Sequence, residues 1–109
     1  MSSGNWKAVE RGVAKILGGE RVPITGRQRG SAPDIAHKTF SIEVKNRKSL
    51  PDWMHDAMDQ AEASAKTGQL PIVILHEVGM PYGASFVVVR LSEFQDWYGD
   101  VQKEINIED

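Results

Sequence analysis

The segment at residues 33–46 has the sequence PDIAHKTFSIEVKN. Its apolar residues at positions 40, 42 and 44 alternate with polar residues at 41, 43 and 45, which is the period-two pattern of a β-strand. Residues 34–37 and 39–46 therefore predict two strands that turn through Lys38. The same alternation places the side chains of Glu43 and Lys45 next to each other on one face.

The flanking sequence predicts further helices and strands. Residues 5–17 carry apolar side chains at helical spacing and are followed by Gly18-Gly19, which is typical of a helix end. A short strand at 21–24 and a loop at 25–32 lead into the central segment. The predicted elements after it are a helix from a capping box at 49–52 to about Thr67, strands at 70–75 and 85–90, and a last helix capped by Ser92.

This order favours an α/β (α+β) fold with one mixed sheet of about five strands and helices packed against it. The apolar run at 70–75 has the pattern of a central strand that is buried on both faces. We expect one domain over residues 1–109, because 109 residues suffice for a single core. Residues 104–109 are expected to be frayed.

Composition excludes several classes of protein. The chain has no cysteine, so disulfides, thiolate metal sites and cysteine nucleophiles are excluded. The longest apolar run is too short for a transmembrane helix, and no signal-peptide pattern is present. We therefore expect a cytoplasmic protein with no membrane partner. No phosphate-binding P-loop or dinucleotide fingerprint occurs, which argues against a nucleotide cofactor.

Charge is distributed unevenly along the chain. The formal net charge is −2. Residues 21–48 contain seven basic and two acidic residues and carry +5, whereas the rest of the chain carries −7. A basic segment on an acidic protein is what a surface that faces phosphate groups requires. An accidental asymmetry is the alternative.

Asp34, Glu43 and Lys45 form the pattern with the most direct chemistry. Two carboxylates and the main-chain carbonyl of Val44 would give Mg²⁺ the oxygen ligands it prefers, and Mg²⁺ can activate water against a phosphodiester. Lys45 would orient and help to deprotonate that water, or offset negative charge in the transition state. The alternative is a surface ion pair of Glu43 with Lys45 or Arg47.

Other polar residues could extend this site. Glu10 projects between the apolar residues of the first helix, toward the body of the protein, although an acid there is more often partly exposed than a ligand. Arg47 and Lys48 continue the basic edge beyond Lys45 and could contact phosphate. Gln60 lies beside the apolar stripe of the middle helix, where a side chain that simply faces solvent is the plain interpretation.

Together these residues resemble the PD-(D/E)xK nuclease superfamily, and most closely the archaeal-type Holliday junction resolvases that also occur in phages. The resemblance rests on Glu10-Arg11, on Gly26-Arg27 to Gly30-Ser31, on Pro33-Asp34 and on Glu43-Val44-Lys45. It implies a restriction-endonuclease-like fold. Glu10, Asp34 and Glu43 would be metal-site acids and Lys45 the catalytic lysine, and the DNA contacts would come from Arg11, Arg27 or Arg29, and Ser31. Several nucleases of this superfamily have a helical Gln that approaches the site, and Gln60 would be its counterpart here.

The function implied is a Mg²⁺-dependent endodeoxyribonuclease of DNA recombination and repair, with Mn²⁺ substituting for Mg²⁺. The enzyme would be a homodimer that cuts four-way DNA junctions symmetrically, and it could be phage-encoded and act in the host cytoplasm. A restriction-like, repair or linear-duplex nuclease of the same fold is one alternative. A nucleic-acid-binding module that does not cut is another.

Overall fold

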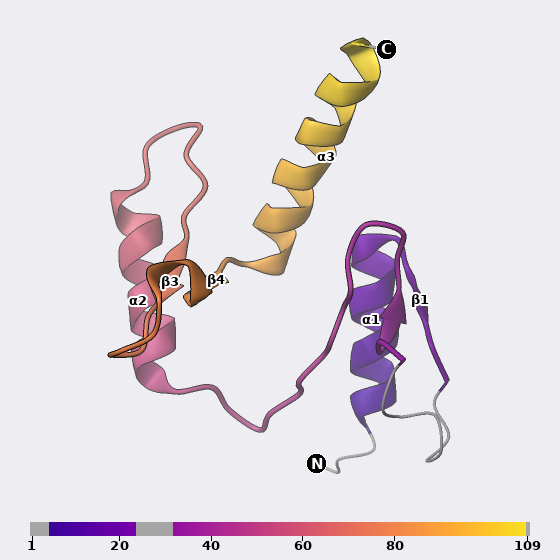
Figure 1. Cartoon of the computed structure of the whole chain (residues 1–109), viewed down its shortest axis with the longest axis horizontal. Coiled ribbons are helices and arrows are strands. Elements are labelled where there is room, and N and C mark those ends of the chain that lie inside the picture. Colours follow the sequence, from indigo (N-terminus) through magenta and orange to yellow (C-terminus); the bar gives the residue numbers. More distant parts are fainter. Residues whose placement is uncertain (1–4, 24–31, 109) are drawn as a thin grey trace. The chain divides into compact units, whose positions relative to one another are not determined.

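The computed structural model describes residues 5–23 and 32–108, with side chains described up to residue 105. Residues 25–31 of the predicted loop, which include Arg27, Arg29 and Ser31, therefore lie outside the described residues. The chain divides into two compact units, residues 1–48 and 49–109, which are described separately below. Helices and short strands occur in both units (Figure 1), so the fold is a mixed α+β fold. Within the described residues no helix is both long and apolar enough to cross a membrane.

The first unit begins with α1, Trp6–Leu17, as the helical spacing predicts. Gly18 ends the helix in the left-handed conformation, with φ 79°, and its N–H bonds to the Ala14 carbonyl. The buried face differs from the predicted apolar stripe, since Glu10 and Ala14 are the buried residues of α1 and Trp6 keeps 38% of its surface exposed. Glu10 thus does point toward the interior of this unit.

Two short strands lie beside α1. β1, Glu20–Arg21, pairs antiparallel with β2, Ile35–Ala36, so that Arg21 is opposite Ile35. Ile35 is fully buried and forms the centre of this core. On its other side Ile35 makes a single antiparallel bridge with Ile42.

The prediction of a strand at residues 39–46 is wrong. In this segment Ile42 forms that single bridge, and the other residues form no strand. Two side chains take backbone amides that a continuous ladder would use. His37 accepts from the amides of Thr39 and Phe40 through Nδ1, at 3.0 and 3.2 Å, and the Val44 amide donates to the Asp34 carboxylate. His37 Nε2 lies 3.0 Å from the Leu17 carbonyl, which ties this turn to the end of α1.

Gly19 sets the spacing between the end of α1 and β2. A Cβ atom at Gly19 would lie 2.5 Å from the Ala36 carbonyl oxygen and 2.8 Å from Cγ2 of Ile35. Backbone cannot move away as a flexible side chain can, so an added methyl group would displace β2 from the core.

We therefore expect Gly19→Ala to lower the free energy of unfolding by about 1–3 kcal/mol, measured by urea denaturation. Gly12→Ala is the matched control, because nothing lies within 4 Å of a Cβ at Gly12 on α1. Alanine is the better helix former, so the control should gain about 0.5–1 kcal/mol. Equal changes in the two variants would show that the close approach at Gly19 carries no strain.

The second unit starts with α2, Asp52–Ser64. Pro51 is its N-cap residue, without a side-chain cap, and the helix ends at Ser64, so the capping box from Ser49 and the end near Thr67 are both wrong. β3, Val73–Leu75, pairs antiparallel with β4, Phe86–Val88, and a 3₁₀ turn, η3, covers Tyr82–Ala84. Arg90 joins the end of this hairpin to α2 by donating to Glu62, and this hydrogen bond lowers the pKa of Glu62.

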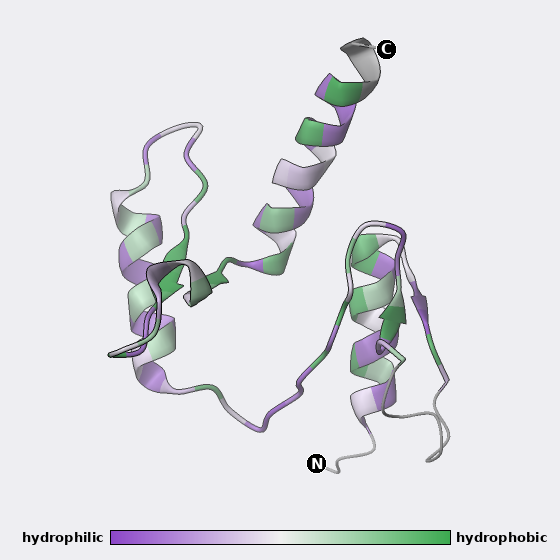
Figure 2. Ribbon diagram, in the orientation of Figure 1, coloured by the Kyte–Doolittle hydropathy of each residue, from purple (hydrophilic) through white to green (hydrophobic). Residues whose placement is uncertain are grey.

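The two strands of this hairpin carry apolar side chains (Figure 2), yet the run at 70–75 is not buried on both faces. Ile72 and Ile74 are 44% and 53% exposed. Among the described residues β4 is the one strand that pairs with β3, and α2 contacts β3. In that part of the chain β3 therefore lacks the second layer that a central strand would have. The last helix, α3, covers Leu91–Glu108. It starts one residue before the predicted cap Ser92 and includes residues 104–108 of the part expected to fray.

The predicted sheet of about five strands is not present in the described residues. The strands there form two separate antiparallel pairs, β1–β2 and β3–β4. Each pair belongs to a different unit, and the residues of 39–46 that would extend the first pair contribute one bridge.

Candidate functional site

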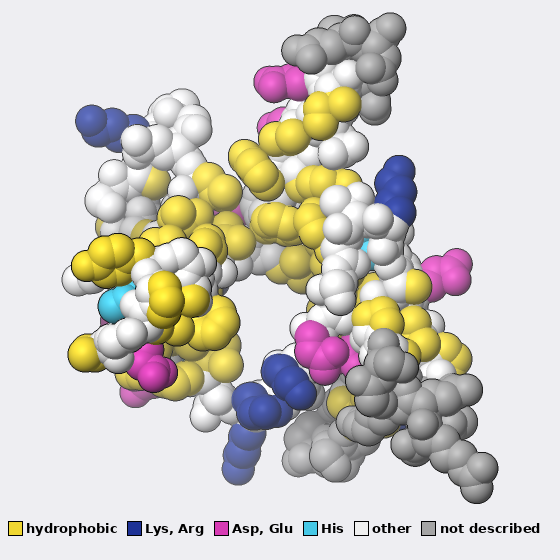
Figure 3. Space-filling model, in the orientation of Figure 1, with side chains coloured by type: hydrophobic (Ala, Val, Ile, Leu, Met, Phe, Trp, Pro, Cys, Tyr) yellow, Lys and Arg dark blue, Asp and Glu magenta, His cyan; other side chains and the backbone are white. Residues whose placement is uncertain are grey.

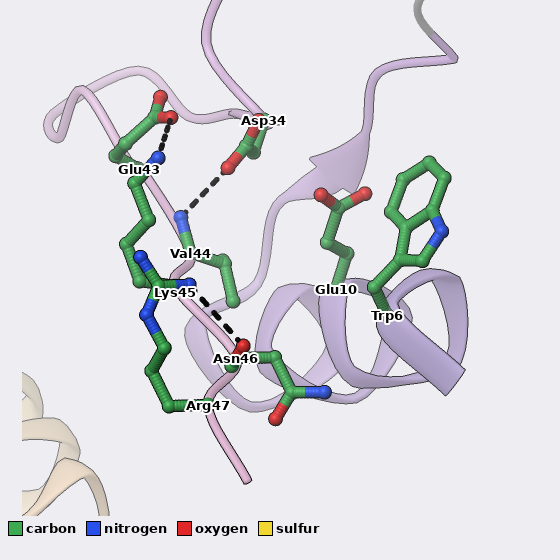
Figure 4. Close-up of a pocket in the computed structure, with 8 residues that line it drawn as sticks. All are labelled: Trp6, Glu10, Asp34, Glu43, Val44, Lys45, Asn46 and Arg47. Carbon is green, nitrogen blue, oxygen red and sulfur yellow. Dashed lines mark hydrogen bonds and ion pairs between the residues drawn. The ribbon is translucent and has the colours of Figure 1, made fainter. Parts of the chain in front are cut away.

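A polar pocket of about 240 Å³ opens on the first unit between α1 and the segment 43–47. Figure 4 shows the residues that line it. Trp6 and Glu10 contribute to it from α1, Asp34 from the residue before β2, and the rest from the chain after Ile42. All four residues predicted to be catalytic line this pocket, and the complete lining is Trp6, Glu10, Asp34, Glu43, Val44, Lys45, Asn46 and Arg47.

Asp34 is held firmly at the centre of this arrangement. Its carbonyl accepts from the amide of Val22 at 2.9 Å, and its amide donates to the carbonyl of Ile42 at 3.1 Å. Its carboxylate oxygen Oδ2 accepts from the Val44 amide at 2.7 Å. Asp34 therefore bridges the chain segments on both sides of β2, and a charge-assisted bond of this kind fixes the direction of its carboxylate.

Glu10 is the buried acid of the pocket. Arg21 Nε donates to its Oε1 at 2.7 Å, and the side chains of Arg21 and Glu10 are 16% and 10% exposed. The Arg21 guanidinium also lies 5.2 Å from the centre of the Trp6 ring. Neither contact follows from the sequence pattern, since the partners lie eleven and fifteen residues apart.

Glu43 and Lys45 lie side by side, as their spacing of two residues predicts. Glu43 Oε2 and Lys45 Nζ are 3.7 Å apart, and the side chains are 61% and 68% exposed. This contact is the surface ion pair that the sequence left open as an alternative. In Figure 4 the Glu43 carboxylate lies toward Lys45 rather than toward Asp34 and Glu10. An exposed pair of this kind contributes about 0–1 kcal/mol, so little free energy keeps Glu43 in this position.

The three acids do not form one cluster in this arrangement. In the part of the chain that the structure describes, no group of three His, Asp or Glu residues is placed to hold a metal ion. The donor types nevertheless suit a hard cation, since the pocket offers carboxylates from Glu10, Asp34 and Glu43.

The predicted DNA-contact residues are only partly at this pocket. Arg47 lines it, with its Nη1 3.4 Å from the carbonyl of Asn46, and the neighbouring Lys48 is exposed. Arg11 is exposed on α1 but is not among the lining residues. Figure 3 shows Lys and Arg side chains grouped beside acidic ones on the face drawn.

Gln60 is not assigned to this site. It is exposed on α2, in the second unit, and its carbonyl accepts a hydrogen bond from the Ser64 hydroxyl. Sequence reasoning missed three other residues of the pocket region, Trp6, Arg21 and Asn46. For Trp6 a signal was present, because it precedes Glu10 by four residues and so shares its helix face.

Comparisons of the chain with protein-family models, with curated proteins and with solved structures found no match.

Proposed function

We propose that this pocket hydrolyses phosphodiester bonds in DNA with the help of a divalent cation. The observation that supports the proposal is the convergence of Glu10, Asp34, Glu43 and Lys45, three acids and one ammonium, on one polar pocket. They come from three separate stretches of the sequence. A shared pocket is the arrangement in which acidic ligands and a cationic side chain could act together on a phosphate.

Asp34 and Glu43 would hold Mg²⁺ or Mn²⁺, together with the main-chain carbonyl of Val44, and Glu10 would complete the set of acids. The bound cation would supply a Lewis acid for the phosphate and would acidify a water molecule. Glu43 would have to leave its exposed contact with Lys45, 3.7 Å long, and the weakness of such surface pairs makes this change small in free energy.

Lys45 would then act on the reacting groups from beside the acids. Its ammonium would orient the attacking water or offset the negative charge that develops on the phosphate, and in its neutral amine form Lys45 would accept the proton that the water loses. Arg47, exposed at the same pocket, would bind a phosphate of the DNA backbone. Arg11, Lys48 and the residues Arg27, Arg29 and Ser31 of the loop are proposed as further backbone contacts, with Gln60 a possible addition.

The proposed substrate is branched DNA, in particular a four-way junction cut by a homodimer in the cytoplasm. A restriction-endonuclease-like fold is part of that proposal. Phosphate contacts supply affinity and position without sequence information. A nuclease that uses mainly such contacts would select its substrate by shape.

A non-cleaving nucleic-acid-binding module is the second candidate function. The Glu43–Lys45 ion pair favours it, because this pair engages two of the four proposed catalytic residues with each other. Such a module would bind DNA through the basic segment and show no cleavage with Mg²⁺ or Mn²⁺.

A comparison of substrates tests the proposed function. We expect the protein with Mg²⁺ to cut a four-way junction faster than a flap or a linear duplex of the same sequence. Equal rates on all three would contradict the resolvase function and favour a general nuclease of the same chemistry. Binding to the junction without any cutting would favour the non-cleaving module.

A further inference from the structure

The buried contact between Arg21 and Glu10 joins two elements next to the pocket. Arg21 lies on β1 directly opposite Ile35 of β2, and directly opposed residues of a strand pair share one face of the sheet. Ile35 is fully buried. The Arg21 side chain therefore lies on the inner face of the strand pair, where it meets Glu10 from α1 at 2.7 Å.

The geometry of this contact leaves part of Glu10 available. Arg21 Nε donates to Oε1, and among the described residues no second hydrogen bond to the Glu10 carboxylate is present. A carboxylate has two oxygens that accept hydrogen bonds or bind cations. Oε2 is thus the atom that Glu10 can present to a ligand in the pocket.

Trp6 restricts the position of Arg21. It stands one helical turn before Glu10, and the Arg21 guanidinium lies 5.2 Å from the centre of its ring, within the range of a cation–π contact. The planar guanidinium can bond to a carboxylate and contact an aromatic ring at the same time, which a lysine ammonium does not reproduce. Arg21 is therefore fixed by two contacts from the same helix face.

We propose that Arg21 is a positioning residue that directs Glu10 toward a divalent cation in the pocket. This inference rests on the proposed function, since it assigns Glu10 a ligand. Arg21 itself does not contact DNA in this account, because its side chain is 16% exposed. Replacing a group that hydrogen-bonds to a metal ligand and orients it typically lowers metal affinity or activity by about 10- to 100-fold.

Calorimetric titration with Mn²⁺ tests the role without relying on cleavage. We expect Arg21→Gln and Glu10→Gln each to weaken Mn²⁺ binding by about 10- to 100-fold. The double variant should be no weaker than the singles, because both changes act through the same carboxylate. Lys15→Gln, which removes an exposed charge from the same helix, should bind Mn²⁺ like the wild type.

Arg21→Lys keeps a positive charge beside the buried acid and serves if Arg21→Gln does not fold. It should also weaken Mn²⁺ binding, by a smaller factor, because it loses the planar contact with Trp6. In cleavage, Arg21→Lys should lower kcat and leave the KM for the junction unchanged, whereas a phosphate contact would raise KM.

Wild-type Mn²⁺ affinity in Arg21→Lys, or in a folded Arg21→Gln, would overturn the positioning role. The positioning role would also be overturned if the losses of Mn²⁺ affinity in Arg21→Gln and Glu10→Gln multiplied in the double variant. If the variants behave this way while the wild type binds Mn²⁺ and cuts DNA, only the role of Arg21 fails. A wild-type protein that binds no Mn²⁺ and cuts no DNA would instead overturn the proposed function, and the inference with it.

Discussion

Replacing Lys45 by alanine is expected to lower the rate of junction cleavage by about 100- to 10,000-fold, the range for loss of a positioned proton-transfer group. The Lys45 ammonium lines the pocket and lies 3.7 Å from Glu43. A group at this position can act on a water or a phosphate that is bound beside the acids. A single-turnover assay on a four-way junction with Mg²⁺ measures the effect.

Stability and binding should change little in this variant. The Lys45 side chain is 68% exposed, and exposed substitutions usually change stability by within about 0.5 kcal/mol. Arg47 remains at the pocket to bind phosphate, so the affinity for the junction should be nearly that of the wild type. Lys38→Ala is the matched control, since Lys38 is exposed in the same unit and does not line this pocket. Loss of binding together with cutting would contradict the catalytic role of Lys45.

Two substitutions of Asp34 distinguish a metal-binding role of this residue from a structural one. Asp34→Asn keeps a side-chain oxygen that can accept from the Val44 amide, which now lies 2.7 Å from Oδ2. It removes the negative charge that a divalent cation requires. We expect this variant to fold and to lose cleavage by about 100-fold or more, comparable with the loss of other charge-stabilising groups.

Asp34→Ala should lose cleavage and also about 1.5–3 kcal/mol of stability, because the hydrogen bond to a charged acceptor disappears. Urea denaturation and the cleavage assay together distinguish the two variants. Glu20→Gln is the control, since Glu20 is an exposed acid on β1. If the Asp34→Asn variant cuts DNA at the wild-type rate, the charge of Asp34 is not needed to bind a metal ion.

Local patterns predicted the first helix and the contact between Glu43 and Lys45. Helical spacing and Gly18 define the extent of α1 because both act within a few residues along the chain. The spacing of Glu43 and Lys45 also predicts their contact, since it requires only an extended backbone. Both of these predictions needed only contacts between residues that are close in the sequence.

Alternation alone could not show that residues 39–46 form one bridge instead of a strand. Side chains of His37 and Asp34 take amides of this segment, and an alternating pattern gives no sign of that competition. The contact of Arg21 with Glu10 depends on the register of β1 against β2, which only the folded chain defines. The burial of the run at 70–75 likewise depended on how many strands would become its neighbours.

The cleavage of a four-way junction, with Mg²⁺ and with a chelator in its place, tests the central claim most directly. The positions of the nicks are mapped on all four strands. We predict paired nicks on opposing strands, which require the metal and are absent in Lys45→Ala. Tight binding to the junction with no nicks in either Mg²⁺ or Mn²⁺ would contradict the account.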